Sequence, residues 1–255
     1  MTKIVSVHSY RGGTGKSNIT ANLAVSMALQ GKRVGIVDTD IQSPGINILF
    51  GLGESVIKHT LNDYLWGRCA IKDVAYDVSN VLEENAIAGV IYLLPSSMKS
   101  EDIARVLSEG YDIERLQTGF YDIAEQLQLD YLFVDTHPGI NEETLLSIGI
   151  SDILILILRP DQQDYLGTAV VLEVAANLDV PQIFLVINKI LSDFDLEALK
   201  TKAEQTYQRP VAGLLPVATE MMRLGSQGIF CLKYADHPVS QEFQQIVSLV
   251  DSKAL

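Results

Sequence analysis

Residues 11–17 read Arg11-Gly12-Gly13-Thr14-Gly15-Lys16-Ser17 and stand between two different hydrophobic patterns. The apolar run Ile4-Val5-Ser6-Val7 before them predicts a short buried strand. Apolar residues at helical spacing after them predict a helix that ends near Gly31. Glycines let a backbone wrap closely around an anion, and the N–H groups at the start of a helix point toward it. The stretch therefore predicts a site for a polyphosphate.

The same stretch fits most of the P-loop pattern, Gly-x-x-x-x-Gly-Lys-[Ser/Thr], but Tyr10 stands where the pattern has its first glycine. In a P-loop, Lys16 reaches the β- and γ-phosphates and the Ser17 hydroxyl ligates Mg²⁺. The alternative is a glycine-rich turn that binds nothing. Carboxylates farther along the chain favour the phosphate site, because they fit the same chemistry.

Two predicted strands end in those carboxylates. Residues 33–37 predict a strand parallel to the first, followed by Asp38-Thr39-Asp40, and residues 131–134 predict a buried strand that ends at Asp135. Because ligands collect at the carboxyl ends of parallel strands, we expect Asp40 and Asp135 beside the phosphate loop, near Mg²⁺ or an attacking water. The alternative for residues 38–45 is an ordinary turn built on Asp and Pro-Gly.

The remaining patterns extend the same architecture over one domain, residues 1–255. The run Ile153–Leu158 is apolar on both faces, as a parallel sheet covered by helices requires. We expect an α/β fold with a mostly parallel sheet of about seven strands and helices on both faces. Further strands are predicted at 91–94, 183–187 and 211–216, and helices at 61–66, 103–107, 113–127, 164–178 and 239–250.

The order of these motifs over nearly the whole chain resembles the MinD/ParA family of deviant Walker A ATPases. That family usually carries Lys-Gly-Gly-x-Gly-Lys-[Thr/Ser], and many members lack the first glycine of the general P-loop pattern. The resemblance implies a SIMIBI-like P-loop NTPase fold and a Mg²⁺-dependent ATPase that acts as a switch. It also implies an ATP-sandwiched homodimer, in which the first lysine of the motif reaches the partner's nucleotide. Here that position holds Arg11.

The resemblance assigns roles residue by residue. Asp40 would position the hydrolytic water, and Arg11, Lys16 and Asp40 would be catalytic. Mg²⁺ would be held by Ser17, Asp40 and Asp135. The nucleotide would contact Gly12, Gly13, Thr14, Gly15, Lys16, Ser17, Asn18, Asn188, Lys189 and Pro216. His137, in the loop after Asp135, is either a group that senses the nucleotide or a partner, or an ordinary polar loop histidine.

Composition narrows the choice of partners. The net charge is −13 and the sequence pI is near 4.6, so a global positive field for nucleic acid is absent, although a local basic patch for DNA stays possible. No apolar run approaches the roughly 18 residues of a membrane span. The predicted last helix has an apolar stripe and few basic residues, so we expect no membrane anchor in the tail. We expect a cytoplasmic protein without a signal peptide.

Two other function classes stay open. One is an iron–sulfur enzyme or cluster carrier of the same superclass, although Cys69 and Cys231 lack the expected cysteine pairing. The other is a nucleotide-binding scaffold with little hydrolysis, regulated by a partner protein. The family resemblance favours an ATPase that is slow without an activating partner and helps to position or partition a cellular assembly. The sequence does not indicate which assembly.

Overall fold

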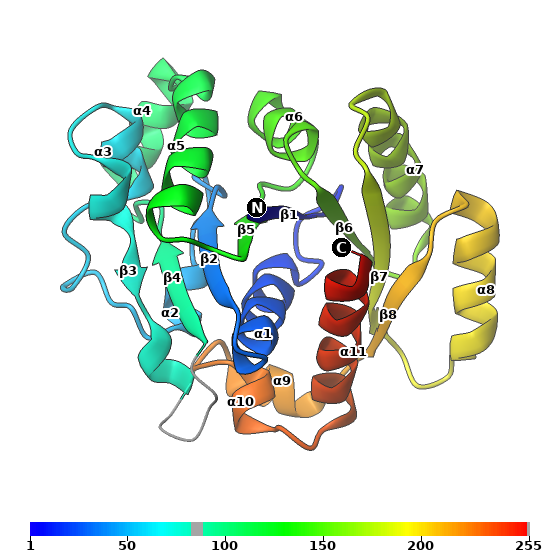
Figure 1. Ribbon diagram of the computed structural model, residues 1–255. Coiled ribbons are helices and arrows are strands. Elements are labelled where there is room, and N and C mark those ends of the chain that lie inside the picture. Colours follow the sequence, from blue (N-terminus) through cyan, green and yellow to red (C-terminus); the bar gives the residue numbers. More distant parts are fainter. Residues whose placement is uncertain (83–88, 254–255) are drawn as a thin grey trace.

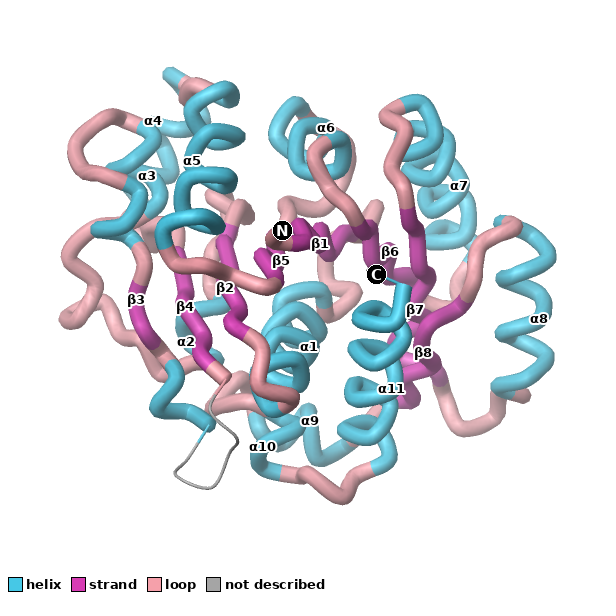
Figure 2. The backbone as a smooth tube through the Cα atoms, viewed as in Figure 1, coloured by secondary structure: helices cyan, strands magenta, loops and turns pink. Residues whose placement is uncertain are grey.

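The computed structural model describes residues 1–82 and 89–253. Within these residues, one sheet has the strand order β3-β4-β2-β5-β1-β6-β7-β8, with only the β3–β4 pair antiparallel. Figures 1 and 2 show the sheet running through the middle of the molecule. The strands are β1 (Lys3–His8), β2 (Arg33–Asp38), β3 (Tyr76–Asp77), β4 (Val90–Leu94), β5 (Tyr131–Asp135), β6 (Ile153–Leu158), β7 (Gln182–Ile190) and β8 (Val211–Pro216).

Helices cover both faces of this sheet (Figure 1). One face carries α1 (Lys16–Leu29), α2 (Ile46–Leu49), α9 (Thr219–Leu224), α10 (Phe230–Lys233) and α11 (Pro238–Lys253). The other carries α3 (Leu61–Leu65), α4 (Ser100–Glu109), α5 (Ile113–Gln126), α6 (Glu142–Gly149), α7 (Gln162–Asn177) and α8 (Leu196–Tyr207). Two short 3₁₀ helices, η1 (Ile71–Val74) and η2 (Ser79–Leu82), flank β3.

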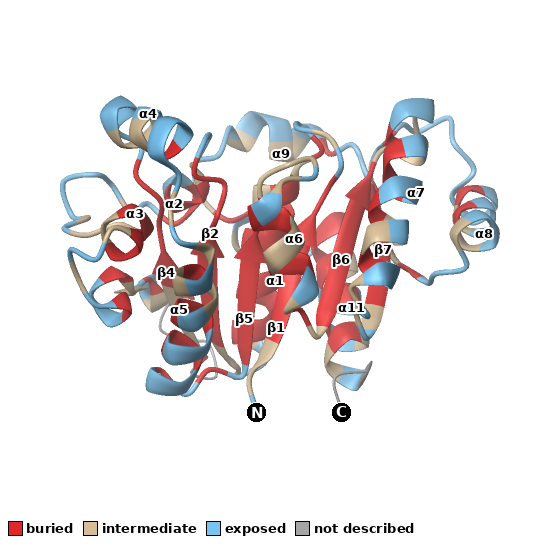
Figure 3. Ribbon diagram, turned by 90° about the horizontal axis from the view of Figure 1, so that it is seen from above, coloured by how far each residue is buried: buried red, intermediate tan, exposed pale blue. Residues whose placement is uncertain are grey.

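The central strand β6 shows how the sequence produces these layers. Its residues alternate Ile and Leu, and successive side chains of a strand point to opposite faces. Ile153, Ile155 and Ile157 join the core beside α1, whereas Leu154 and Leu156 join the core beside α6 and α7. Figure 3 shows buried strands between helices that expose only their outer surfaces. A strand that is apolar on both faces is thereby fully covered.

The last helix, α11, uses its apolar stripe inside the fold. Val239, Phe243, Ile246 and Val250 are buried in the core that α1 shares, and α11 packs against both β8 and α1. Among the described residues, no helix is both long and apolar enough to cross a membrane. The expectation that the tail lacks a membrane anchor stays a prediction.

The structure differs from the sequence predictions in three respects. The sheet has an eighth strand because Tyr76 and Asp77 pair with β4 in a segment without periodic hydrophobicity. Strand β7 does not end before Asn188, because Asn188 still pairs with Leu215 of β8, and a bulge there carries the strand to Ile190. The sequence did not predict helices α2, α6, α8, α9 and α10. The single domain expected for residues 1–255 stays a prediction, and 83–88 and 254–255 lie outside the described residues.

Candidate functional site

The loop between β1 and α1 needs its glycines. Gly13 and Gly15 have φ angles of 76° and 96°, in the left-handed region that favours glycine. A Cβ atom on Gly15 would lie 2.6 Å from the amide nitrogen of Asn188. The loop therefore depends on glycine both for its backbone angles and for the approach of β7.

Two residues at the end of β7 hold this loop in place. Asn188 Nδ2 donates to the Thr14 carbonyl oxygen at 2.7 Å, and Lys189 Nζ donates to the Gly13 carbonyl oxygen at 2.7 Å. Lys189 has a φ of 58° at the β7 bulge. Asn188 and Lys189, which were expected to contact the nucleotide, thus also support the backbone that would surround its phosphates.

Lys16 meets two of the predicted carboxylates. Its Nζ lies 3.3 Å from Asp135 Oδ1 and 3.7 Å from Asp40 Oδ2, and all three side chains are almost completely buried. Burial alone would lower the pKa of Lys16, but the carboxylates of Asp135, Asp40 and Asp38 outweigh it, so the pKa is raised. Lys16 is therefore a fixed positive charge at the bottom of the loop. Parallel pairing of β2 and β5 brings the carboxylates here, as the sequence predicted.

Asp38 is a residue whose role the sequence analysis did not assign. Its Oδ1 accepts from the Asp40 N–H at 3.1 Å, and its Oδ2 accepts from the Gly45 N–H at 3.2 Å, so it holds both ends of the loop that carries Asp40. Burial raises the pKa of Asp38, and the nearby Asp135 and Asp40 carboxylates raise it further. Ser96 donates to the Asp38 carbonyl at 2.6 Å and ties this loop to the end of β4.

His8, at the end of β1, is a second residue that the sequence analysis missed. Thr136 Oγ1 donates to the Val7 carbonyl, so the contact of 2.7 Å between His8 Nδ1 and Thr136 Oγ1 requires the histidine to donate. Burial, together with the nearby Lys16 and His137, lowers the pKa of His8 to about 3. His8 is thus a neutral ring behind the phosphate loop. A buried histidine before a glycine-rich loop has no sequence signal of its own.

A cavity of about 250 Å³ opens above the loop and is lined by residues 11–18 together with Asp40, Ser43 and Pro138. Thr14 Oγ1 in this lining, and Oδ2 of Asp135 beside Lys16, are buried without a hydrogen-bond partner among the described residues. Backbone N–H groups, a buried lysine and oxygen ligands suit a magnesium polyphosphate, because Mg²⁺ takes one or two carboxylates together with substrate phosphates. In the described part of the chain, no three His, Cys, Asp or Glu residues gather to hold a metal by themselves.

A mostly apolar groove of about 410 Å³ continues from Gly15 and Asn18. Asn188 and Pro216, which were expected to contact the nucleotide, line it. Met221, Met222 and Phe243 complete it, although α9, which carries both methionines, was not predicted. An apolar groove that includes the amides of Asn18 and Asn188 suits a flat heteroaromatic base.

Arg11 lies at the rim of the phosphate cavity and pairs with the first turn of α7. Its Nη1 is 3.6 Å from Asp164 Oδ1 and 3.7 Å from Asp161 Oδ1, and 40% of its side chain is exposed. Asp164 is itself buried and accepts from Arg159 Nε at 2.9 Å. Arg11 therefore shares an already paired carboxylate, and these long contacts leave its guanidinium accessible.

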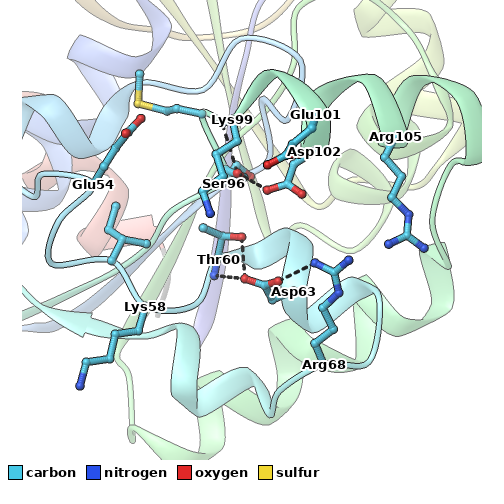
Figure 4. A pocket seen from close by; sticks show the side chains of 13 residues that line it. Glu54, Lys58, Thr60, Asp63, Arg68, Ser96, Lys99, Glu101, Asp102 and Arg105 are labelled. Atoms are coloured by element: carbon cyan, nitrogen blue, oxygen red, sulfur yellow. Dashed lines mark hydrogen bonds and ion pairs between the residues drawn. The ribbon is translucent and has the colours of Figure 1, made fainter.

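A separate polar cavity of about 390 Å³ lies beyond the end of β4 (Figure 4). Two of its four acidic side chains are hydrogen-bonded to neighbours: Asp63 accepts from Thr60 and Arg68, and Asp102 accepts from Ser97. Its cations and carboxylates are equal in number along the lining, so its charge points to no ligand class.

Comparison with known proteins places this site in a family. The ParA family, described as NUBPL iron-transfer P-loop NTPase, matches residues 1–251. The chain belongs to the MinD/ParA family of P-loop ATPases. An uncharacterized ATP-binding protein from Methanocaldococcus jannaschii is 27% identical over 97% of this chain and 87% of its own length. An iron–sulfur cluster carrier protein from the same organism is 27% identical over 98% of this chain and 84% of its own length.

The fold also matches solved structures of this family. The septum site-determining protein MinD from Pyrococcus horikoshii, complexed with Mg-ADP, has a TM-score of 0.82 and 24% identity, with 100% of this chain and 98% of that chain covered. The MinD/ParA family predicted from the motifs is confirmed, and so is the mostly parallel α/β fold.

The two cysteines are not brought together. Cys231 is buried beside α1, where its N–H donates to Asn22, whereas Cys69 packs at the other face of the sheet. Within one chain, this protein therefore lacks the paired thiols that an iron–sulfur cluster carrier was expected to need.

Proposed function

We propose that this protein is a Mg²⁺-dependent ATPase that works as a dimeric switch. The observation that carries the proposal is Lys16, buried between Asp135 and Asp40 under a glycine loop with two left-handed positions. These groups match phosphoryl transfer, in which positioning and charge stabilisation supply most of the catalysis.

Each residue then has a task. The loop N–H groups and Lys16 hold the β- and γ-phosphates. Ser17, Asp40 and Asp135 would hold Mg²⁺, which would supply positive charge to neutralise the phosphates, and Asp40 would also orient the attacking water. The apolar groove with Asn188 takes the adenine. The site is open toward solvent, and we expect slow turnover in a cytoplasmic protein that waits for an activating partner.

The surface beside Arg11 supports the dimer. Tyr10, Leu166 and Val170 are exposed there and line, with Arg11, a shallow cavity of about 370 Å³. Arg11 borders both this cavity and the phosphate cavity. A second copy of the chain seated on this apolar face would bring each Arg11 close to the other copy's nucleotide. An arginine supplied in this way contributes on the order of 10³–10⁵ in rate in other phosphoryl-transfer enzymes.

The test is sedimentation of the Asp40→Ala protein, which should hold ATP without turnover, in Mg-ATP and in Mg-ADP. We expect a dimer in ATP alone. Arg11→Ala should bind ATP normally but stay monomeric, whereas Arg209→Ala, at an exposed site outside this surface, should behave as the wild type. A protein that binds ATP, stays monomeric and does not hydrolyse it would favour the scaffold alternative.

The proposed cellular role rests mainly on the family resemblance. MinD and plasmid partition proteins share the fold, and we propose that this chain likewise helps to position a cellular assembly. The iron–sulfur alternative, which one relative's name suggests, is tested by iron analysis and a visible spectrum of protein purified without oxygen.

A further inference from the structure

His137, in the loop after β5, has one ring nitrogen with a defined partner. Its Nδ1 lies 2.6 Å from the carbonyl oxygen of Pro138. A carbonyl oxygen can only accept a hydrogen bond, so Nδ1 carries the hydrogen. In the neutral ring, Nε2 is then an acceptor with a free lone pair.

A second hydrogen-bond acceptor, the Asp40 carboxylate, lies beside that lone pair. His137 Nε2 lies 3.9 Å from Asp40 Oδ1, which is too long for a direct hydrogen bond. A water oxygen about 2.8 Å from each atom fits this spacing and can donate one hydrogen to each. His137 is 21% exposed and Asp40 keeps 10% of its side chain exposed, so water can reach the position from the His137 side.

The partners of Asp40 fix its side of this arrangement. Asp40 Oδ1 accepts from the Ser43 N–H at 3.2 Å and from Ser43 Oγ at 2.9 Å, while Oδ2 faces Lys16 Nζ at 3.7 Å. The carboxylate is therefore held with Oδ1 toward His137 and Oδ2 toward the phosphate-binding lysine. A water bound to Oδ1 lies beside the phosphate cavity that Asp40 lines.

We propose that His137 is a second positioning residue for the attacking water, acting together with Asp40. The proposal rests on the ATPase function proposed above. When the water donates to both acceptors, a lone pair of its oxygen is left to attack. The water oxygen bonds to the γ-phosphorus, and the bond from that phosphorus to the β–γ bridging oxygen breaks, with its electron pair leaving on ADP. The water proton that is hydrogen-bonded to Asp40 passes to Asp40 and then to the phosphate product, while the other proton stays on the attacking oxygen.

The variants separate this role from simple packing. Gln at position 137 can place its amide oxygen near the site of Nε2, whereas Asn reaches only as far as Nδ1. We expect His137→Asn to lower kcat on the order of 10²-fold, with KM for ATP nearly unchanged, because the attacking water loses one of the two acceptors that orient it. His137→Gln should recover most of that loss. His59→Gln, at a histidine remote from the site, is the matched control.

Two further readouts complement the turnover assay, and the first of them needs no turnover. Nitrogen-15 NMR of histidine-labelled protein without nucleotide should show His137, assigned by the loss of its signal in His137→Gln, with hydrogen on Nδ1. The ATP-bound dimer of His137→Asn should persist longer than that of the wild type, because ATP still binds but hydrolysis is slower. Thermal unfolding and binding of a fluorescent ATP analogue confirm that each variant is folded.

The outcomes are distinguishable. A wild-type protein that binds ATP but does not hydrolyse it refutes the proposed function, and the role of His137 falls with it. If the wild type hydrolyses ATP and His137→Asn keeps kcat within twofold, only the role of His137 is refuted. A spectrum with the hydrogen on Nε2 refutes it as well.

Discussion

Gly167, in the middle of α7, is buried under the side chain that replaces the first P-loop glycine. A Cβ atom built there would lie 2.1 Å from Tyr10 Cδ1, 2.3 Å from its Cγ and 2.8 Å from its Cβ. The last of these atoms is next to the backbone, so the ring cannot escape by turning its far end. Gly167→Ala must therefore displace Tyr10 itself, which directly precedes Arg11.

Two opposing effects determine how far Gly167→Ala changes the free energy of unfolding. Alanine in place of glycine in a helix is worth about 1 kcal/mol of stability, while overpacking costs about 1–3 kcal/mol. We expect Gly167→Ala alone to lower the free energy of unfolding by up to about 2 kcal/mol. Tyr10→Gly removes the obstructing atoms, so in that background the alanine should raise the free energy of unfolding by about 1 kcal/mol. The coupling energy is then the overpacking cost, about 1–3 kcal/mol.

Urea unfolding of the wild type, both single variants and the double variant measures this coupling. Tyr10→Gly also restores the general P-loop pattern, and comparing ATP affinity across the four proteins shows whether the ring positions the phosphate loop. Free energies of unfolding that add to within about 0.5 kcal/mol would refute the reasoning, since they would mean that Tyr10 and Gly167 do not share this space.

Three further predictions concern other parts of the fold. Hydrogen bonds from Lys32 and Tyr131 lower the pKa of Asp251. The stabilisation from the charged Asp251 is therefore present above the unfolded pKa of about 4 and is lost as pH falls through the lower folded pKa. Asp251→Asn should lower the free energy of unfolding by about 1 kcal/mol at pH 7 in thermal or urea unfolding, and this difference from the wild type should vanish in acid. Asn188→Ala should weaken nucleotide binding and reduce the preference for ATP over GTP by about tenfold in competition titrations, because the amide that we propose pairs with adenine is lost; an unchanged preference would exclude that contact. A Cβ on Gly89 would lie 2.0 Å from the backbone oxygen of Ala28, so Gly89→Ala should destabilise the protein by more than about 2 kcal/mol, and an unchanged melting temperature would contradict this.

Short-range patterns predicted most of the strands because a strand's burial is encoded in a few consecutive residues. The run Ile153–Leu158 and the Asp that follows residues 131–134 needed no distant information. Strand β3 was missed because two residues, Tyr76 and Asp77, carry too little pattern, and only pairing with β4 orders them. The end of β7 was misplaced because Asn188 and Lys189 look like turn residues, whereas hydrogen bonding to β8 continues the strand.

The sequence by itself determined the glycine loop, the lysine at its end and the carboxylates at two strand ends, because loop, helix start and strand end are local features and parallel strands align their carboxyl ends. Only the tertiary structure decided that Asn188 and Lys189 support the loop, that Arg11 pairs with Asp164, and that His137 faces Asp40. These contacts join residues far apart in the chain, and their existence depends on strand register and side-chain orientation, which no local pattern encodes.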